Sequence, residues 1–447
     1  MNPKQQKSYY KHCSSKTFYL KETLCHRRLA VAWRACMEVE AMSREALTRA
    51  QQEKLAKMLA YCVKHVPFYR DWASQNGMHK KALRLDEFPI IDKGTIRGQE
   101  ERFVSDEFQL NKLSSCRTSG STGQPFLFYK SKNSFDHTYA TLWRGLARYG
   151  IRPGDKRVLI KGLDVTQKLG LRQKLNRKLY NALNRCLLFD AHFLAINPQS
   201  LGTVIRKIVA YKPDYYHGYV SSIYQVARYV EENKVDVSGL RLKAIVTESE
   251  KLHDFQRECL DRVFGVPVVE NYGSVEFGMI AQPDTAGNLC VNEDHVVVET
   301  TVEGEAVITN LDEYGFPFIR FKNGDLLELG GPGKILPYQI ITSLKGRVAE
   351  TIYLPSGGSL QGFVVMYPIS KHMKWIKSYQ VYQPKLNHLI LRFVLDGDLP
   401  ERIKKQIVDE MREIVGEEMQ LSLECVDRIS LTRRGKQRFV ISELHRG

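Results

Sequence analysis

A run of small polar residues, TSGSTG at 118–123, has hydrogen-bonding groups but too little apolar surface to pack a core. Glycines let a backbone approach a ligand closely, and free N–H groups with side-chain hydroxyls form a concave set of donors that suits phosphate oxygens. The P-loop of nucleoside triphosphatases places four residues between its glycines and then Gly-Lys-Ser/Thr. Here only two residues separate Gly120 from Gly123. Taken alone, the run is also typical of a flexible surface loop.

Helices and strands must position this loop. Apolar residues at helical spacing predict a helix from about residue 28 to 66, ended by Pro67, and another over 136–150. The segment FPIIDKGTIR at 88–97 predicts a loop and strand leading toward the polar run, and KRVLIKGL at 156–163 predicts a strand.

The second half of the chain changes its pattern twice. Predicted helices and strands alternate over 203–273, which favours an α/β sheet with crossover helices. After Gly278, short strands and turns indicate a β-rich subdomain. The last hundred residues alternate strands with one helix at 400–416, which predicts a small α+β domain.

Composition limits the classes of protein. At 447 residues the chain exceeds the size at which one core stops growing, so we expect two or more domains. Hydrophobic residues at 43% and a mean hydropathy of -0.34 describe a globular chain. We see no apolar run near the roughly 18 residues that span a membrane, and the polar start MNPKQQKSYYKHCSSK does not resemble a secretory signal. We therefore expect a cytoplasmic protein.

Cysteine spacing and net charge add two further expectations. The nine cysteines form no C-x-x-C pair and no Cys/His spacing typical of zinc sites, which favours buried packing roles in a reducing compartment. Lysine and arginine outnumber aspartate and glutamate 66 to 50, for a formal charge of +16. This excess favours anionic partners such as nucleotides, phospholipid surfaces or acidic sugars.

A basic amphipathic segment occupies 168–187, KLGLRQKLNRKLYNALNRCL. Leucines recur every four residues from Leu171 to Leu187, and arginines and lysines supply the polar side. One interpretation is an ordinary surface helix. The other is a helix that docks on a membrane surface or an anionic carrier.

Five segments resemble, in the same order, the signatures of the adenylate-forming superfamily, which contains the acyl-CoA synthetases and their relatives. They are TSGSTGQP at 118–125, ENYGSVEFG at 270–278, FPFIRFKNGDLLEL at 316–329, LKGRVAETI at 344–352 and LTRRGKQRF at 431–439. VKHVPFYRDW at 63–72, FPIIDKGTIR and the short total length resemble the phenylacetate-CoA ligase branch. The likeness is strongest to its CapK-like members, which occur in polysaccharide biosynthesis.

The resemblance covers about residues 55–440 and implies a two-domain α/β architecture. A large N-terminal adenylate-forming domain, with α/β sheets and a β-rich subdomain, would occupy 1–345 and bind ATP and a carboxylate. A small mobile α+β domain would occupy 346–447 and carry the catalytic lysine.

The resemblance also implies an ATP and Mg²⁺ site. The polar run would hold the β- and γ-phosphates through Thr118, Ser119, Gly120, Ser121, Thr122 and Gly123. Tyr272 would stack on adenine at the start of Tyr272-Gly273-Ser274, and Glu276 would ligate Mg²⁺ through a hard carboxylate oxygen. Ser249 and Glu250 fall where the family places its adenine-edge segment, although a plain strand-to-helix turn is the alternative.

Further residues would act on the ribose, the phosphates and the acyl substrate. Asp325 would accept hydrogen bonds from both ribose hydroxyls, and Arg347 would reach the ribose or phosphates as a fixed charge. Lys436 would bridge the substrate carboxylate and the α-phosphate as negative charge builds there. The expected catalytic group is thus Lys436, Glu276 and Arg347. His217 is a candidate contact for the acyl substrate, with a purely structural histidine as the alternative.

Three positions depart from the family pattern and motivate a rival hypothesis. Gln124 replaces the lysine that closes the loop, Val275 replaces a hydroxyl residue, and Ala349 replaces the hinge acid. A non-catalytic nucleotide-binding scaffold of the same fold would tolerate these changes. The retained charged residues favour an enzyme, because a scaffold has no need of a transition-state lysine.

The sequence therefore predicts a ligase that activates a carboxylic acid with ATP to an acyl-adenylate and releases pyrophosphate. The acyl group would pass to an amine or hydroxyl acceptor, such as a sugar or amino acid of a polysaccharide, or to coenzyme A. We expect no nucleic-acid partner and expect peripheral contact with the inner membrane face. The acid, the acceptor and the oligomeric state are not indicated, because residues of the acyl site are scattered between about 130 and 280.

Overall fold

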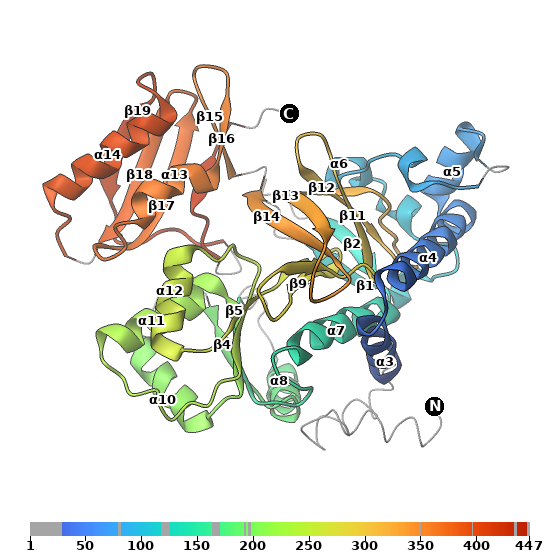
Figure 1. Ribbon diagram of the computed structural model, residues 1–447, viewed down its shortest axis with the longest axis horizontal. Coiled ribbons are helices and arrows are strands. Elements are labelled where there is room, and N and C mark those ends of the chain that lie inside the picture. Colours follow the sequence, from blue (N-terminus) through green and yellow to red (C-terminus); the bar gives the residue numbers. More distant parts are fainter. Residues whose placement is uncertain are drawn as a thin grey trace.

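The computed structural model describes residues 29–444, apart from 79–81, 118–125, 163–169, 192–193, 195–197, 348–349, 396 and 433–435. Over these residues the chain forms a five-stranded and a seven-stranded sheet with surrounding helices, followed by a C-terminal unit with its own four-stranded sheet (Figure 1). Among the helices described, none is long and apolar enough to cross a membrane. The predicted class, α/β with a C-terminal α+β unit, is confirmed.

The N-terminal region is helical but contains a break that periodicity does not predict. Instead of one helix over 28–66, two helices meet at Ser43, whose hydroxyl accepts a hydrogen bond from the Ala46 N–H at 3.3 Å and caps the second. The helices here are α3 (Leu29–Glu40), α4 (Arg44–His65), α5 (Pro67–Gln75) and α6 (Lys93–Ile96), with 3₁₀ turns at Leu85–Glu87, Glu100–Phe103 and Leu110–Lys112.

The predicted strand within 88–97 is wrong except for one bridge between Ile91 and Phe321. Asp92 accepts a hydrogen bond from the Thr95 N–H at 2.8 Å and starts α6 instead. After it, β1 (Ser114–Arg117) and β2 (Leu127–Lys130) pair antiparallel on either side of the polar run. The loop itself lies outside the described residues, as do Gln124 and Ala349.

The five-stranded sheet is entirely parallel and has the strand order β4-β3-β5-β6-β7. Its strands carry buried aliphatic and aromatic side chains, as expected for a sheet covered by crossover helices. The elements are β3 (Arg157–Lys161), α8 (Leu171–Leu183), β4 (Cys186–Asp190), a 3₁₀ turn (Pro198–Ser200), α10 (Leu201–Tyr211), β5 (Tyr215–Tyr219), α11 (Val220–Glu232), β6 (Ala244–Glu248), α12 (Asp254–Phe264) and β7 (Val268–Glu270).

The described part of the basic segment, residues 170–187, is only partly helical. Helix α8 ends at Leu183, Arg185 takes a left-handed backbone with φ of 48°, and Cys186 begins the edge strand β4. Leu187 therefore belongs to a strand, and its place in the four-residue periodicity does not reflect one helix face.

The seven-stranded sheet is antiparallel and has the order β11-β12-β13-β14-β10-β9-β8. An aromatic cluster lies in the core beside this sheet. Phe126, just before β2, and Phe128, in β2, pack there against three further rings, Phe316, Phe318 and Phe321. Helix α7 (Lys132–Ala147) packs against α3 and β9. The strands are β8 (Tyr272–Ser274), β9 (Gly278–Pro283), β10 (Leu289–Val291), β11 (Val296–Thr300), β12 (Glu305–Asn310), β13 (Phe321–Pro332) and β14 (Gln339–Arg347).

The C-terminal unit has a mixed sheet of order β19-β18-β17-β20 and a small β15–β16 hairpin. Helix α14 buries Ile403, Ile407, Met411 and Val415, which recur at helical spacing, in the core of this unit. The elements are β15 (Thr351–Tyr353), β16 (Ser359–Gln361), α13 (Gly362–Ser370), β17 (Ile376–Lys385), β18 (His388–Leu395), α14 (Glu401–Val415), β19 (Gln420–Cys425) and β20 (Val440–Ser442).

Candidate active site

The two large sheets meet at Asn271, between β7 and β8. The segment at 266–273, which reads as one strand in the sequence, is divided there: β7 pairs with β6 in the parallel sheet, and β8 pairs with β9 in the antiparallel sheet. The carboxyl ends of β3, β5 and β6 face the same junction. In open parallel sheets, ligands bind outside the carboxyl ends of the strands.

Tyr272 and Asp325, predicted to contact the adenine and the ribose, lie together at this junction. The Tyr272 hydroxyl donates to Asp325 Oδ2 at 2.9 Å, and the Asn323 amide donates to the same oxygen at 2.8 Å. Both Tyr272 and Asp325 are buried. The second oxygen, Oδ1, lies 3.2 Å from Arg347 Nε. The Asp325 carboxylate is thus held through both of its oxygens, and it still has lone pairs that can accept hydrogen bonds from further donors.

Arg347 reaches Asp325 because the two residues face each other across β13 and β14. Asp325 follows Gly324 within β13, where a φ of +84° is a backbone conformation that favours glycine. Glu350 lies beyond Arg347, and burial raises the pKa of its carboxyl. The intervening Val348 and Ala349 lie outside the described residues.

Glu276, the predicted metal ligand, is buried in the turn between β8 and β9. The Ser274 hydroxyl accepts a hydrogen bond from the Phe277 N–H at 3.2 Å and shapes this turn, while Val275 points to solvent. Lys93 Nζ lies 3.7 Å from Glu276 Oε1.

The sequence motifs assign no role to Lys93, the first residue of α6, which the Asp92 cap places near Glu276. The available signal was the Asp92-Lys93-Gly94-Thr95 segment, an Asp three residues before a Thr that forms a capping box. This capping motif predicts where the helix starts, but it does not predict that Lys93 will lie near Glu276.

Ser249 and Glu250 follow β6, and Glu250 connects the C-terminal unit to the rest of the molecule. Ser249 has φ of 71°, an uncommon conformation for a residue other than glycine. Glu250 accepts hydrogen bonds from the Ser221 N–H at 2.8 Å, at the start of α11, and from the Gln437 N–H at 3.1 Å, in the C-terminal unit. Burial raises the pKa of the Glu250 carboxyl against the effect of these donors.

Lys436, the predicted catalytic lysine, lies next to this contact. Its Nζ is 5.3 Å from the centre of the Tyr219 ring, at the carboxyl end of β5. Its N–H donates to Thr432 Oγ1 at 3.0 Å, and Leu431 forms a β-bridge with Gln437, so these contacts hold the backbone of the lysine in place. Burial first, and then the Arg347 cation, lower the pKa of Lys436 to about 8. The neighbouring Gly435 lies outside the described residues.

His217, in the middle of β5, belongs to a polar cluster with Lys161 and Glu248, which are the last residues of the neighbouring strands β3 and β6. Its Nε2 lies 3.0 Å from Glu248 Oε2, and Lys161 Nζ lies 2.9 Å from Glu248 Oε1. Burial alone would raise the pKa of Glu248, but His217 and Lys161 outweigh it and hold the pKa well below its ordinary value. At the next residue, Gly218, a side chain would collide with the carbonyl oxygen of Ile160.

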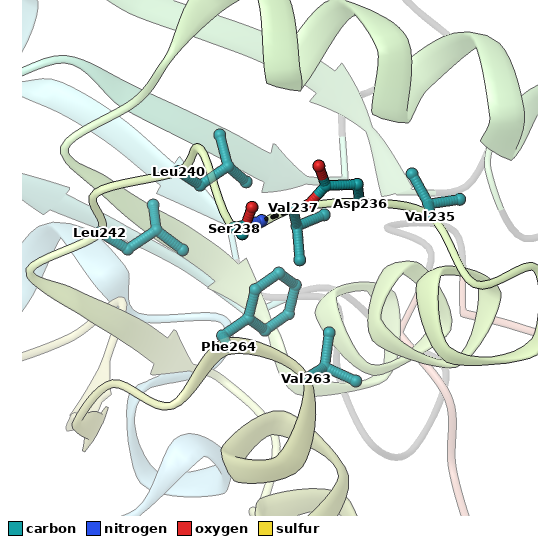
Figure 2. Close-up of a pocket in the computed structure, with 8 residues that line it drawn as sticks. All are labelled: Val235, Asp236, Val237, Ser238, Leu240, Leu242, Val263 and Phe264. Carbon is teal, nitrogen blue, oxygen red and sulfur yellow. Dashed lines mark hydrogen bonds between the residues drawn. The ribbon is translucent and has the colours of Figure 1, made fainter.

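A surface pocket lies away from all of these residues. It is formed by the segment after α11 and the end of α12, and its volume is about 360 Å³ (Figure 2). The lining residues are Val235, Asp236, Val237, Ser238, Leu240, Leu242, Val263 and Phe264. None of the residues that the sequence predicts for the site contributes to it.

This chain is similar in sequence and in fold to several known proteins. Residues 352–443 match the family described as the CapK C-terminal domain. Protein CapK of Staphylococcus aureus is 24% identical over 89% of this chain and 90% of its own length. Phenylacetate-coenzyme A ligase of Pseudomonas putida is 25% identical over 71% and 74%.

A solved structure shares the fold over nearly the whole chain. It is 2-hydroxyisobutyryl-CoA ligase in the postadenylation state in complex with R3-HIB-AMP, with a TM-score of 0.72, 16% identity, and coverage of 90% of this chain and 91% of that one. The CapK-like and phenylacetate-CoA ligase homologues, together with this shared fold, support the adenylate-forming ligase superfamily and its phenylacetate-CoA ligase and CapK-like branch.

Proposed function

We propose that this protein uses ATP to convert a carboxylic acid into an acyl-adenylate with release of pyrophosphate, and then transfers the acyl group to an acceptor. The observation that carries the proposal is the place of Lys436. The C-terminal unit brings its ammonium to the carboxyl end of β5, on the side of the junction where Arg347, Asp325 and Tyr272 meet. A cation there can balance charge that develops between the substrate carboxylate and the α-phosphate.

Different residues would bind different parts of the nucleotide. Asp325, held by Tyr272 and Asn323, would accept the ribose hydroxyls, and Arg347 would interact with ribose or phosphate oxygens. The 118–123 loop would hold the β- and γ-phosphates. Attack of the carboxylate oxygen on the α-phosphorus forms the P–O bond of the acyl-adenylate as the bond to pyrophosphate breaks, and positioning with electrostatics carries this step.

Glu276 fits a magnesium ion that arrives with ATP. Mg²⁺ is usually held by one or two carboxylates together with phosphates and waters, and Glu276 is a single buried carboxylate with Lys93 as its near cation. When bound, the ion would neutralise phosphate charge. Lys93 adds positive charge beside that site, although Gln124 supplies none where the family has a lysine.

The acceptor in the second step would be an amine or hydroxyl of a sugar or amino acid in polysaccharide biosynthesis, or the thiol of coenzyme A. The likeness to protein CapK over most of both chains supports the first, and the phenylacetate-coenzyme A ligases support the second. His217, in β5 two residues before Tyr219 at the end of that strand, would contact the acyl substrate. We place the protein in the cytoplasm at the inner membrane face, a location that the exposed basic helix α8 supports.

The test is ATP–pyrophosphate exchange with Mg²⁺ and pooled acids: aryl acids, amino acids, fatty acids and uronates. We expect exchange that depends on one pool and that falls by at least about a hundredfold in Lys436→Ala, while ATP binding persists. Lys405→Ala, an exposed lysine on α14, is the matched control and should leave exchange unchanged. Bound ATP without exchange in any pool, and no effect of Lys436→Ala, would favour the scaffold.

A further inference from the structure

Helix α8 (Leu171–Leu183) has no buried residue at all. Leu171, Leu175 and Leu179 are 87%, 67% and 58% exposed, whereas α14 buries apolar residues at the same kind of spacing in the core of its own unit. The helix joins β3 to the edge strand β4 and lies at the rim of the molecule (Figure 1). Its apolar side therefore faces away from the core of its own chain.

An uncovered helix of this length needs stabilisation from elsewhere. Isolated helices of fewer than about 12–15 residues are marginal in water, and most helical stability in proteins comes from packing an apolar face. The 13 residues of α8 lack that packing. Exposed leucines at four-residue spacing form one continuous stripe, which indicates a surface that completes its burial against a partner.

The charges on α8 indicate which kind of partner would cover its leucines. The helix carries Arg172, Lys174, Arg177 and Lys178, and between residues 171 and 185 the sequence has no acidic residue. With about 100° between successive residues, the three leucines span about 80°, with Lys178 next to one side of the stripe and Arg172 next to the other. Cations on both flanks of an apolar stripe can reach lipid phosphates while the stripe enters the acyl region.

We propose that α8 docks on an anionic phospholipid surface, with Leu171, Leu175 and Leu179 inserted at the boundary between headgroups and acyl chains. The helix lies in the plane of the membrane and its lysines and arginines pair with lipid phosphates. The formal charge of +16 attracts the whole molecule to the same surface. This inference stands independently of the reaction that the site catalyses.

The test is sedimentation of the full-length protein with vesicles of phosphatidylcholine alone or with phosphatidylglycerol added. We expect binding to the anionic vesicles that weakens as salt rises, and at least about tenfold weaker binding to the neutral ones. The triple variant Leu171→Gln, Leu175→Gln, Leu179→Gln should lose binding by about tenfold or more. Glutamine favours helix as leucine does, and α8 buries no residue, so folding should be unchanged.

Two further variants separate insertion from mere attraction. Arg172→Gln with Lys178→Gln should weaken anionic binding and flatten its salt dependence, whereas Arg402→Gln with Lys405→Gln on α14 removes the same charge elsewhere and should change it little. A Leu175→Trp variant should show a blue-shifted emission that is quenched by brominated lipid chains.

Three results would overturn the proposal. One is no binding of the unaltered protein to anionic vesicles. Another is undiminished binding by the triple leucine variant with no quenching of Leu175→Trp, which would mean electrostatic adsorption alone. The third is a change in oligomeric state, measured by light scattering, caused by the leucine variant without any change in vesicle binding, which would identify a second copy of the chain as the partner.

Discussion

Lys436 is the residue whose charge state matters most for the proposed reaction. Burial and Arg347 lower the pKa of its ammonium to about 8, whereas Glu250 and Glu248 act in the opposite direction. A lysine with a lowered pKa is protonated below that value and becomes neutral as the pH rises through it. The cation needed beside the developing negative charge is therefore lost at alkaline pH.

We accordingly expect the rate of adenylation to fall as the pH rises above about 8, measured by pyrophosphate exchange at saturating ATP. Lys436→Arg keeps a positive charge throughout this range, because arginine titrates above about 12. It should be slower but lose the alkaline decline. An unchanged decline in Lys436→Arg would assign the titration to another group.

Tyr272 offers a second test on the scale of one residue. Tyr272→Phe keeps a ring for adenine and removes the hydroxyl that donates to Asp325 at 2.9 Å. A hydrogen bond to a charged group contributes about 1.5–3 kcal/mol, so we expect KM for ATP to rise roughly tenfold or more with a smaller change in kcat. Steady-state kinetics at saturating acid measure both. A fall in kcat alone would contradict a binding role.

Helix α7 and the antiparallel sheet are joined by a buried ion pair. Arg144, on α7, donates through two nitrogens to Asp294 at 2.8 Å each and to Asn292 at 2.8 Å. Its guanidinium also lies 5.2 Å from the centre of the Tyr338 ring. Removing one partner of such a pair leaves an uncompensated buried charge.

Arg144→Ala should therefore destabilise the protein by about 3–5 kcal/mol. Because a chain with several units need not unfold in one step, the apparent melting temperature and the urea midpoint should both be measured. Lys132→Ala, an exposed position near the start of α7, should leave both unchanged. Equal effects of the two substitutions would show that the helix, rather than the ion pair, carries the stability.

On the scale of the whole molecule, the contact between Glu250 and the Gln437 N–H ties the C-terminal unit to the start of α11. Phe255 of α12 adds apolar contact with the core of that unit, and His253 lies 5.4 Å from the ring of Phe439. These contacts hold Lys436 against the large part of the chain. They should matter for adenylation and not for a later step that uses another arrangement.

Glu250→Gln replaces a charged acceptor with a neutral amide, and we expect it to slow adenylation by roughly tenfold. Transfer from preformed acyl-adenylate should be unchanged. Single-turnover assays of the two half-reactions measure these separately, and Glu258→Gln, an exposed carboxylate on α12, is the control. Equal slowing of both half-reactions would indicate a general structural role instead.

Periodicity and turn chemistry are local properties, so the sequence by itself determined much of the fold. The alternation over 203–273 correctly predicted β5, β6 and their helices, and the spacing at 400–416 predicted α14. The five ordered motifs predicted the superfamily. The ends of strands and helices were harder to predict, because a single side chain such as Ser43 or Asp92 can start a helix within an otherwise uniform pattern.

Only the tertiary structure decided which distant residues meet. Glu250 and Gln437 are 187 positions apart, and Tyr272 and Asp325 are 53 apart. Lys93 lies near Glu276 because the Asp92 cap starts α6 there, but the capping motif does not predict which residue Lys93 will contact. The leucines of α8 have helical spacing whether or not they are covered, and burial depends on what packs beside the helix. Local sequence specifies the shape of each element, whereas contacts and exposure arise from how the elements assemble.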